Sequence, residues 1–319
     1  MKLCRLAATV VLALTAMVLA VPEAAAHRWG CWIQPNRTVN TRNTATNFSQ
    51  ANAALNEWDA DTILSIPRLN SHTEVSIFDG NYGNTGWGGL ASIESASGCN
   101  ITHGHATLNY YYSYSSNGKR GVFCQEVGHL FGLDHSNDGG CMGGGYFYDI
   151  NTNYQVVSHN ISDINGMYAN RLVMPGGNDE LGPVAAEPVG PRHSAVWYHN
   201  PRTLSDLHRL STAIVIARVT GVFDAPDIVV AAALEGGEHR VPNQRIAFEV
   251  ERTLAGRIGR EFELFHTGND EFVVAGDPPY AIGEAHVLFV QPRDDGSYLV
   301  VSPEGRYQVT KEGLEAASH

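Results

Sequence analysis

The sequence predicts a mixed α/β (α+β) domain with one central mixed sheet, followed by a small antiparallel β-barrel or sandwich domain. Three observations support this fold class. The first half of the chain alternates strand-like runs with helix-like periodicity, whereas the second half holds short β-branched runs separated by Gly, Pro and Asp. Between them, residues 173–196 are dense in Pro and Gly, which is typical of a linker. We therefore expect one domain over residues 27–172 and a β-rich module over residues 197–319.

The elements expected in the first domain alternate as they do in an α/β domain. The helix expected at residues 48–64 places Ala54, Leu55 and Trp58 on one side, as an amphipathic helix requires. Ser162 is a suitable N-cap for a last helix. The full series is a strand at 37–46, a helix at 48–64, strands at 75–78 and 105–112, a helix at 121–130 and the helix after Ser162.

The second half of the chain is expected to fold from strands. It shows no group of His, Cys or paired carboxylates that would form a site, so we expect the chemistry in the first domain. The expected strands lie at residues 213–223, 245–254, 261–265, 286–290, 298–302 and 306–310.

Residues 1–26 have the pattern of a signal peptide. Lys2 and Arg5 precede an apolar stretch at residues 6–21, and the small residues at 24–26 suit a cleavage before His27. The apolar stretch is short for the ~20 residues that a spanning helix needs. The sequence therefore predicts a secreted or periplasmic protein with no membrane association after cleavage of the signal.

The chain is acidic, with a formal net charge of −12. This charge repels the phosphates of nucleic acids and of anionic membrane surfaces. We therefore expect no nucleic-acid partner, and the composition leaves the oligomeric state open.

Four cysteines remain after the signal peptide, and an even number in an oxidising compartment predicts disulfides. Three pairings are possible. We favour Cys124 with Cys141, because that bond would tie the start of the helix at 121–130 to the segment after it, which leaves Cys31 with Cys99.

The run CQEVGHLFGLDHS has the spacing of a zinc site. On a helix, Gln125, Glu126 and His129 fall on one side and the apolar residues on another. Gly132 allows the chain to turn after the helix, so that His135 comes back toward His129. Two imidazoles suit zinc, which in a catalytic site keeps a position open for water and lowers the pKa of that water toward ~7. Glu126 is placed to take the proton as a general base.

QEVGHLFGLDHS, followed by CMGGGY, resembles the zinc-binding region of the metzincin peptidases, HExxHxxGxxH with a later Met-turn. The Ser after the last His is most similar to the matrixin branch, and Met142 matches the methionine of the Met-turn. The resemblance covers about residues 27–172 and is strongest over 124–142. It implies a matrixin-like catalytic domain, a zinc ion (Zn²⁺), a protein or peptide substrate, and a substrate chain that pairs with the strand at 105–112.

Gln125 stands where that family has its first zinc-ligating histidine. A neutral amide oxygen is a weaker ligand for zinc than imidazole, so the affinity should fall by more than ~10 to 100-fold. Three outcomes are open. Gln125 ligates zinc together with His129 and His135, or His103 or His105 replaces it, or the protein has lost catalysis.

The sequence therefore predicts an exported zinc-dependent endopeptidase with Glu126 as general base and with His129, His135 and Gln125 as metal ligands. The alternative is a catalytically inactive binding protein on the same scaffold, which Gln125 would explain. The β-rich module is expected to bind a substrate, a wall component or the first domain.

Overall fold

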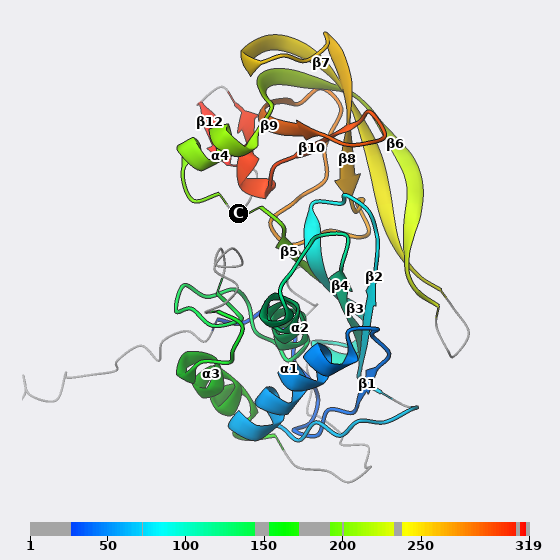
Figure 1. Cartoon of the computed structure of the whole chain (residues 1–319), viewed down its shortest axis with the longest axis vertical. Helices are drawn as coiled ribbons and strands as arrows, with labels where there is room; N and C mark the ends of the chain where they lie inside the picture. The colour runs from blue at the N-terminus through cyan, green and yellow to red at the C-terminus, as the bar shows by residue number, and fades with distance from the viewer. Residues whose placement is uncertain are drawn as a thin grey trace, which may run out of the picture.

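The computed structural model describes residues 27–71, 73–143, 153–171, 192–199, 201–232, 238–310 and 313–316. The expected signal peptide and most of the expected linker lie outside these residues. Two mixed sheets and four α-helices make up the described part of the chain, and the sheets occupy opposite halves of the molecule (Figure 1). Within the described ranges, no helix has the length and apolar character needed to span a membrane.

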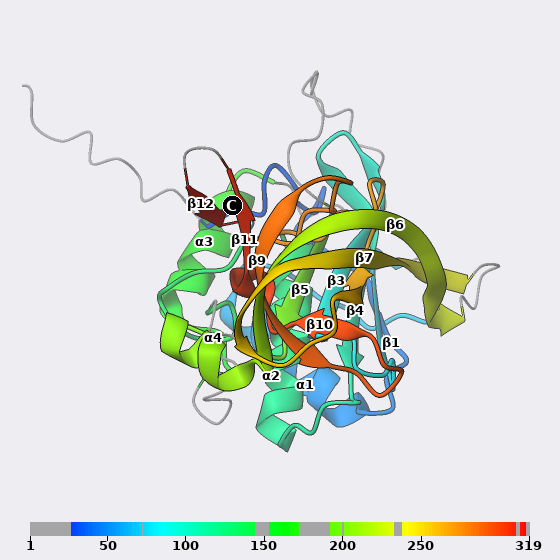
Figure 2. The same cartoon turned by 90° about the horizontal axis from the view of Figure 1, so that it is seen from above.

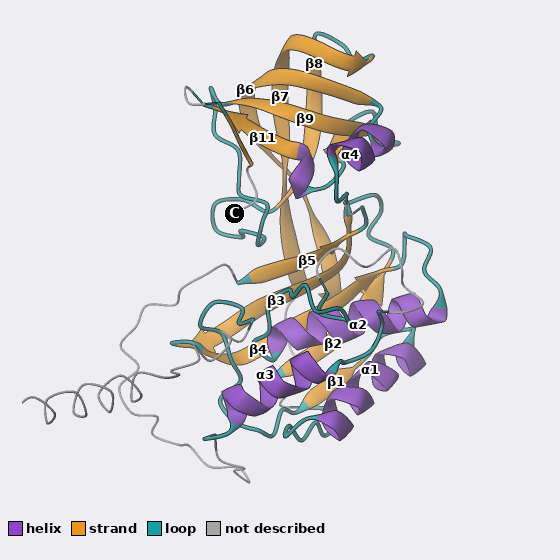
Figure 3. Cartoon of the chain, turned by 90° about the vertical axis from the view of Figure 1, so that its left-hand side faces the viewer, coloured by secondary structure: helices purple, strands orange, loops and turns teal. Residues whose placement is uncertain are grey.

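The first sheet has five strands, β1 (Thr41–Asn43), β2 (Val75–Gly80), β3 (Trp87–Ser97), β4 (Asn100–Asn109) and β5 (His193–Trp197). Their order is β1-β2-β4-β3-β5. β2 is parallel to β1 and β4, whereas β3 is antiparallel to β4 and β5, so the sheet is mixed as expected. One side of the sheet carries the helices α1 (Phe48–Asp61), α2 (Ser116–Leu130) and α3 (Ser158–Tyr168) (Figure 3).

Several boundaries differ from those expected. α2 begins five residues before position 121, because the Ser115 hydroxyl accepts a hydrogen bond from the Gly118 N–H (3.1 Å) and caps the helix. The prediction of Ser162 as an N-cap is wrong, because the buried Asn160 side chain already accepts from the Val157 N–H (3.4 Å) in the first turn of α3. β4 begins at Asn100 and ends three residues before position 112.

β3 and β5 are the strands of this sheet that the sequence does not reveal. β3 begins directly after a Gly- and Asn-rich stretch. β5 begins inside the expected linker at His193, yet it pairs with β3 over five residue pairs. The chain therefore returns to the first sheet before it enters the β-rich module.

The second sheet contains β6 (Ala213–Ala232), β7 (Glu238–Gly256), β8 (Glu261–Thr267), β9 (Ala285–Pro292), β10 (Tyr298–Val300), β11 (Arg306–Val309) and β12 (Leu314–Ala316), with helix α4 (Leu204–Leu210) before it. Each of the six runs predicted as strands overlaps one of these strands. β10 pairs with both β8 and β9, so the ladder from β6 to β10 closes on itself (Figure 2). The expectation of a purely antiparallel arrangement is wrong, because β10 leaves β9 in a hairpin and its other edge meets β8 in the parallel direction.

A core of large apolar side chains holds α2 in place. Trp58 on α1 is fully buried, and its indole N–H donates to the Cys124 carbonyl of α2 (3.1 Å). Disulfides join Cys124 to Cys141 and Cys31 to Cys99, which is the pairing favoured from the sequence. α2 is therefore fixed by α1 on one side and by the disulfide that joins its Cys124 to Cys141.

The hairpin of β6 and β7 extends away from the second sheet and lies beside the first (Figure 1). The Tyr82 hydroxyl donates to the Val230 carbonyl of this hairpin (2.7 Å). Trp87 and Leu90 of β3 share a buried apolar cluster with Val230 and Val241. The two halves of the molecule are thus joined by side-chain packing as well as by the chain after β5.

Candidate metal centre and active site

The end of α2 brings His129 and His135 to one point. The helix ends at Leu130, and Gly132 has a φ of 98°, a left-handed conformation that favours glycine. This turn places the Leu133 carbonyl 2.8 Å from His129 Nδ1. The Nε2 atoms of the two histidines then lie 3.2 Å apart.

The arrangement of the two rings fits a zinc ion. His129 Nδ1 carries a hydrogen, because the Leu133 carbonyl can only accept, so Nε2 offers its lone pair. Burial lowers the pKa of His129 well below its usual value, with a contribution from His135, and burial also lowers the pKa of His135. Both rings are therefore held in the neutral form that binds metals. Two nitrogens on a tetrahedral zinc at ~2.0–2.1 Å are about 3.3 Å apart, close to the spacing of these two.

Gln125 precedes His129 by about one helical turn and lies on the same side of α2. It is 2% exposed, and its side-chain oxygen Oε1 has no hydrogen-bond partner among the described residues. A buried amide oxygen without a partner costs free energy. A cation would supply the missing partner, so Gln125 fits as a third ligand, although its oxygen binds zinc less strongly than imidazole does.

Glu126 lies beside these ligands and is fully buried. Neither carboxylate oxygen makes a hydrogen bond of ordinary geometry within the described part of the chain. Burial raises the pKa of Glu126 well above its usual value, and the nearby Val196 N–H offsets this only in part. Gly89 makes room for the carboxylate, because a Cβ at that position would lie 2.2 Å from Glu126 Oε1. A carboxyl whose pKa is raised in this way suits proton transfer near neutral pH.

Met142, which the sequence analysis compares with the methionine of a Met-turn, lies against α2. Its side chain is fully buried, and a Cβ on Gly128 would lie 2.3 Å from its sulfur atom. Its carbonyl accepts a hydrogen bond from the Ser136 N–H (2.8 Å), directly after His135. Met142 thereby ties the end of the metal motif to the underside of the helix that carries His129.

β5 covers the candidate site. It forms the outer strand of the sheet next to β3, and its Ser194 hydroxyl lies 3.2 Å from His129 Nε2. Val196 of the same strand is buried in the core and contributes the N–H near Glu126. The edge of β3 that faces the site is therefore occupied by a segment of the chain itself.

The expectation that residues 105–112 form a peptide-binding edge is wrong. β4, which contains the first part of this range, lies between β2 and β3, and both of its edges are paired. The strand whose outer edge lies along the site is β3, which the sequence did not reveal. An extended peptide has access to this edge only where β5 now lies.

The alternative in which His103 or His105 replaces the missing ligand does not fit the structure. A Cβ on Gly104 would contact Leu130 of α2, so this position of β4 faces the helix. Neighbouring residues of a strand point to opposite faces of the sheet, so His103 and His105 lie on the face away from α2. His105 contacts Glu94 and His239 instead, and His103 contacts His105.

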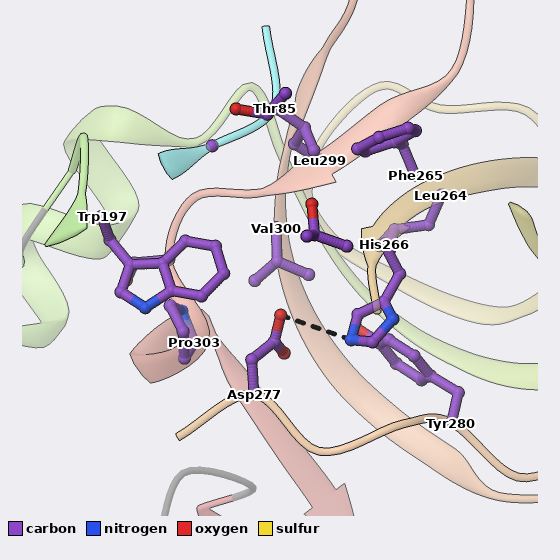
Figure 4. Close-up of a pocket in the computed structure, with 13 residues that line it drawn as sticks. Thr85, Trp197, Leu264, Phe265, His266, Asp277, Tyr280, Leu299, Val300 and Pro303 are labelled. Carbon is purple, nitrogen blue, oxygen red and sulfur yellow. Dashed lines mark ion pairs between the residues drawn. The ribbon is translucent and has the colours of Figure 1, made fainter. Parts of the chain in front are cut away.

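A separate pocket lies where the end of β5 meets the second sheet (Figure 4). Trp197 and Thr85 line one side of it, and His266 and Asp277 form an ion pair on the other (3.3 Å). The pocket holds two potential metal ligands, one fewer than a zinc site requires from the protein. We therefore place the candidate active site at the end of α2.

Comparison with known proteins adds little to this assignment. No protein-family model matches the chain. The search of curated proteins finds no match either. A solved structure described as "Structure of myroilysin" aligns with a TM-score of 0.26 and 14% sequence identity, over 34% of this chain and 54% of that chain. The chain thus spans about half the length of that protein, and a likeness at this level carries no argument about fold or activity.

Proposed function

We propose that this protein is a metal-dependent endopeptidase whose active site is closed by its own strand β5. The observation that carries the proposal is the convergence of His129, His135 and the buried Glu126 at the end of one helix. The N-terminal signal pattern and the two disulfides further support export to the cell exterior or the periplasm.

His129, His135 and the Gln125 side-chain oxygen would hold a zinc ion. When bound, zinc would polarise the peptide carbonyl and lower the pKa of a water molecule. Glu126 takes the proton from water and returns it to the leaving amine, and its raised pKa favours this second step. His129 keeps its orientation through the hydrogen bond to the Leu133 carbonyl.

The substrate in this proposal is an extended peptide that pairs with β3 in place of β5. β5 runs antiparallel to β3 and brings a residue, Ser194, to within 3.2 Å of a proposed ligand. Main-chain pairing of this kind provides affinity with little sequence preference. Unfolded proteins are therefore the substrate class that we expect.

A noncatalytic binding protein is the second candidate function. It is favoured by Gln125, which weakens the metal site, and by the closed state of the cleft. In that case the edge of β3 would bind an extended segment of a partner without cleaving it.

The two functions are separated by assays on the full chain. Cleavage of unfolded casein and bound zinc are measured for the wild type, Glu126→Gln and Gln125→His. We expect slow cleavage by the wild type, which is lost with a chelator, restored by zinc and lowered at least about 100-fold by Glu126→Gln. An inert wild type together with an active Gln125→His variant would instead refute the peptidase function of the natural protein.

A further inference from the structure

A second group of metal-binding side chains lies on the face of the first sheet away from α2. It consists of Glu94 on β3, His105 on β4 and His239 on β7, and we name it the Glu94 cluster. One possible ligand atom from each residue lies within 4.8 Å of the others. Glu94 Oε1 is 2.9 Å from His239 Nδ1 and 3.6 Å from His105 Nδ1. Both histidines are buried, at 7% and 8% exposure.

The hydrogen bonds of the neighbouring His103 determine which nitrogen of His105 is available. His103 Nδ1 lies 2.7 Å from the Thr73 carbonyl and therefore carries a hydrogen. When both rings are neutral, His103 Nε2 accepts a hydrogen from His105 Nε2 at 3.0 Å. His105 Nδ1 is then left with a lone pair that faces the Glu94 carboxylate.

Glu94 itself is exposed, and its carboxylate reaches the two buried histidines from the surface of the sheet. Two electron-rich atoms that face each other repel unless a cation lies between them. The hydrogen of His105 is used in the contact with His103, so the nitrogen that faces Glu94 carries none. His105 Nδ1 and His239 Nε2 have no hydrogen-bond partner within the described residues.

We propose that the Glu94 cluster binds a divalent transition-metal ion, with zinc as the best match. Two imidazoles and one carboxylate are a common ligand set for zinc. The spacings of 2.9 and 3.6 Å bracket the about 3.3 Å expected between ligands of a tetrahedral zinc. The ion would be separate from the one proposed at His129 and would not depend on peptidase activity.

The position of the Glu94 cluster indicates its role. Two of its members belong to the first sheet, whereas His239 belongs to the hairpin of β6 and β7. A metal ion at this point joins the β-rich module to the first sheet next to β5. His193 at the start of β5 lies near the cluster, because it pairs with Ser92, two residues before Glu94 on β3.

The test is the zinc content of the full chain after removal of metal and back-titration. The background variant His129→Gln with His135→Gln removes the proposed catalytic site. In this background we expect one tightly bound zinc per chain. Adding His239→Gln should weaken its binding at least 100-fold, whereas His208→Gln, the same change at an exposed histidine, should leave it unaltered.

Glu94→Gln keeps the size of the side chain and guards against misfolding of the His239 variant. It should give a similar loss of zinc affinity, together with faster hydrogen exchange in β7 near residue 239. The proposal is overturned if the background variant binds no zinc. It is also overturned if Glu94→Gln and His239→Gln both retain as much zinc as His208→Gln does.

Discussion

Coverage of the candidate site by β5 predicts that loosening this strand activates the proposed peptidase. Val196 is the side chain to change, because it is 3% exposed and belongs to the core shared with α2. In the closed state it is buried, and in an open state that admits a peptide it would be exposed. Val196→Ala therefore weakens the closed state and leaves the open state nearly unaffected.

The expected gain in activity follows from the number of buried carbon atoms that Val196→Ala removes. Val196→Ala removes two methyl carbons, each worth about 0.8 kcal/mol of burial, and leaves a small cavity. The closed state should therefore lose about 2 kcal/mol relative to the open state. Because each 1.4 kcal/mol is a factor of ten, the open population and kcat/KM should rise about 30-fold, provided that the closed state dominates in the wild type.

The assay combines casein cleavage with hydrogen exchange of β5. Glu126→Gln in the Val196→Ala background must abolish the gain, which shows that the same site is responsible. Val39→Ala is the matched control, because Val39 is fully buried in the same core but lies outside β5. It should lower the stability of the domain by a similar amount without raising activity.

Each combination of results has a distinct meaning. Unchanged exchange in β5 would refute the idea that Val196 holds the cleft closed. Faster exchange without any gain in cleavage would show that β5 opens onto a site that does not hydrolyse peptides. An equal gain in Val39→Ala would refute the assignment of the effect to β5.

Three further predictions concern other parts of the molecule. Gln125→His should raise zinc affinity by more than about 10-fold, measured by competition with a chelating dye. Gly89→Ala should lower the free energy of unfolding, measured by chemical denaturation, by about 1 to 3 kcal/mol, because its Cβ would lie 2.2 Å from Glu126. The control is Gly166→Ala, where the Cβ has open space and the change should be neutral or stabilising. Burial, with the nearby Arg306, lowers the pKa of His286 to about 4, so between pH 6.5 and 4 only the unfolded chain gains this proton. As the pH falls through that window, the free energy of unfolding should decrease by about 3 kcal/mol. In the His286→Gln variant the decrease should be correspondingly smaller.

Local patterns in the sequence were enough to predict that His129 and His135 converge. The spacing of the residues predicted that His129 lies on a helix and His135 follows the turn after it. This was possible because a helix and a glycine turn both depend on residues that are close in the sequence. The strands of the β-rich module were equally visible, since their β-branched runs alternate with turn residues. Both features depend on interactions that are close in the chain.

The features that the sequence did not reveal depend on pairing between distant segments. β5 is five residues long and follows a stretch rich in Pro and Gly, so only its partner β3 makes it a strand. His239 stands alone in its region of the sequence, and it becomes a possible ligand only because the hairpin of β6 and β7 reaches Glu94. Such pairings are set by the whole fold and not by local propensity.

β5 also connects the two proposed metal sites. Its Ser194 faces α2 and contacts His129, whereas the preceding His193 faces the other side of the sheet, where it stacks on Phe272 at 3.4 Å. A metal ion in the Glu94 cluster would hold the hairpin against the face that His193 occupies, and so would favour the closed cleft. A peptide that replaces β5 must break these same contacts. Because such coupling is reciprocal, occupancy of the cleft by a substrate should weaken metal binding at the Glu94 cluster as much as that metal weakens substrate binding.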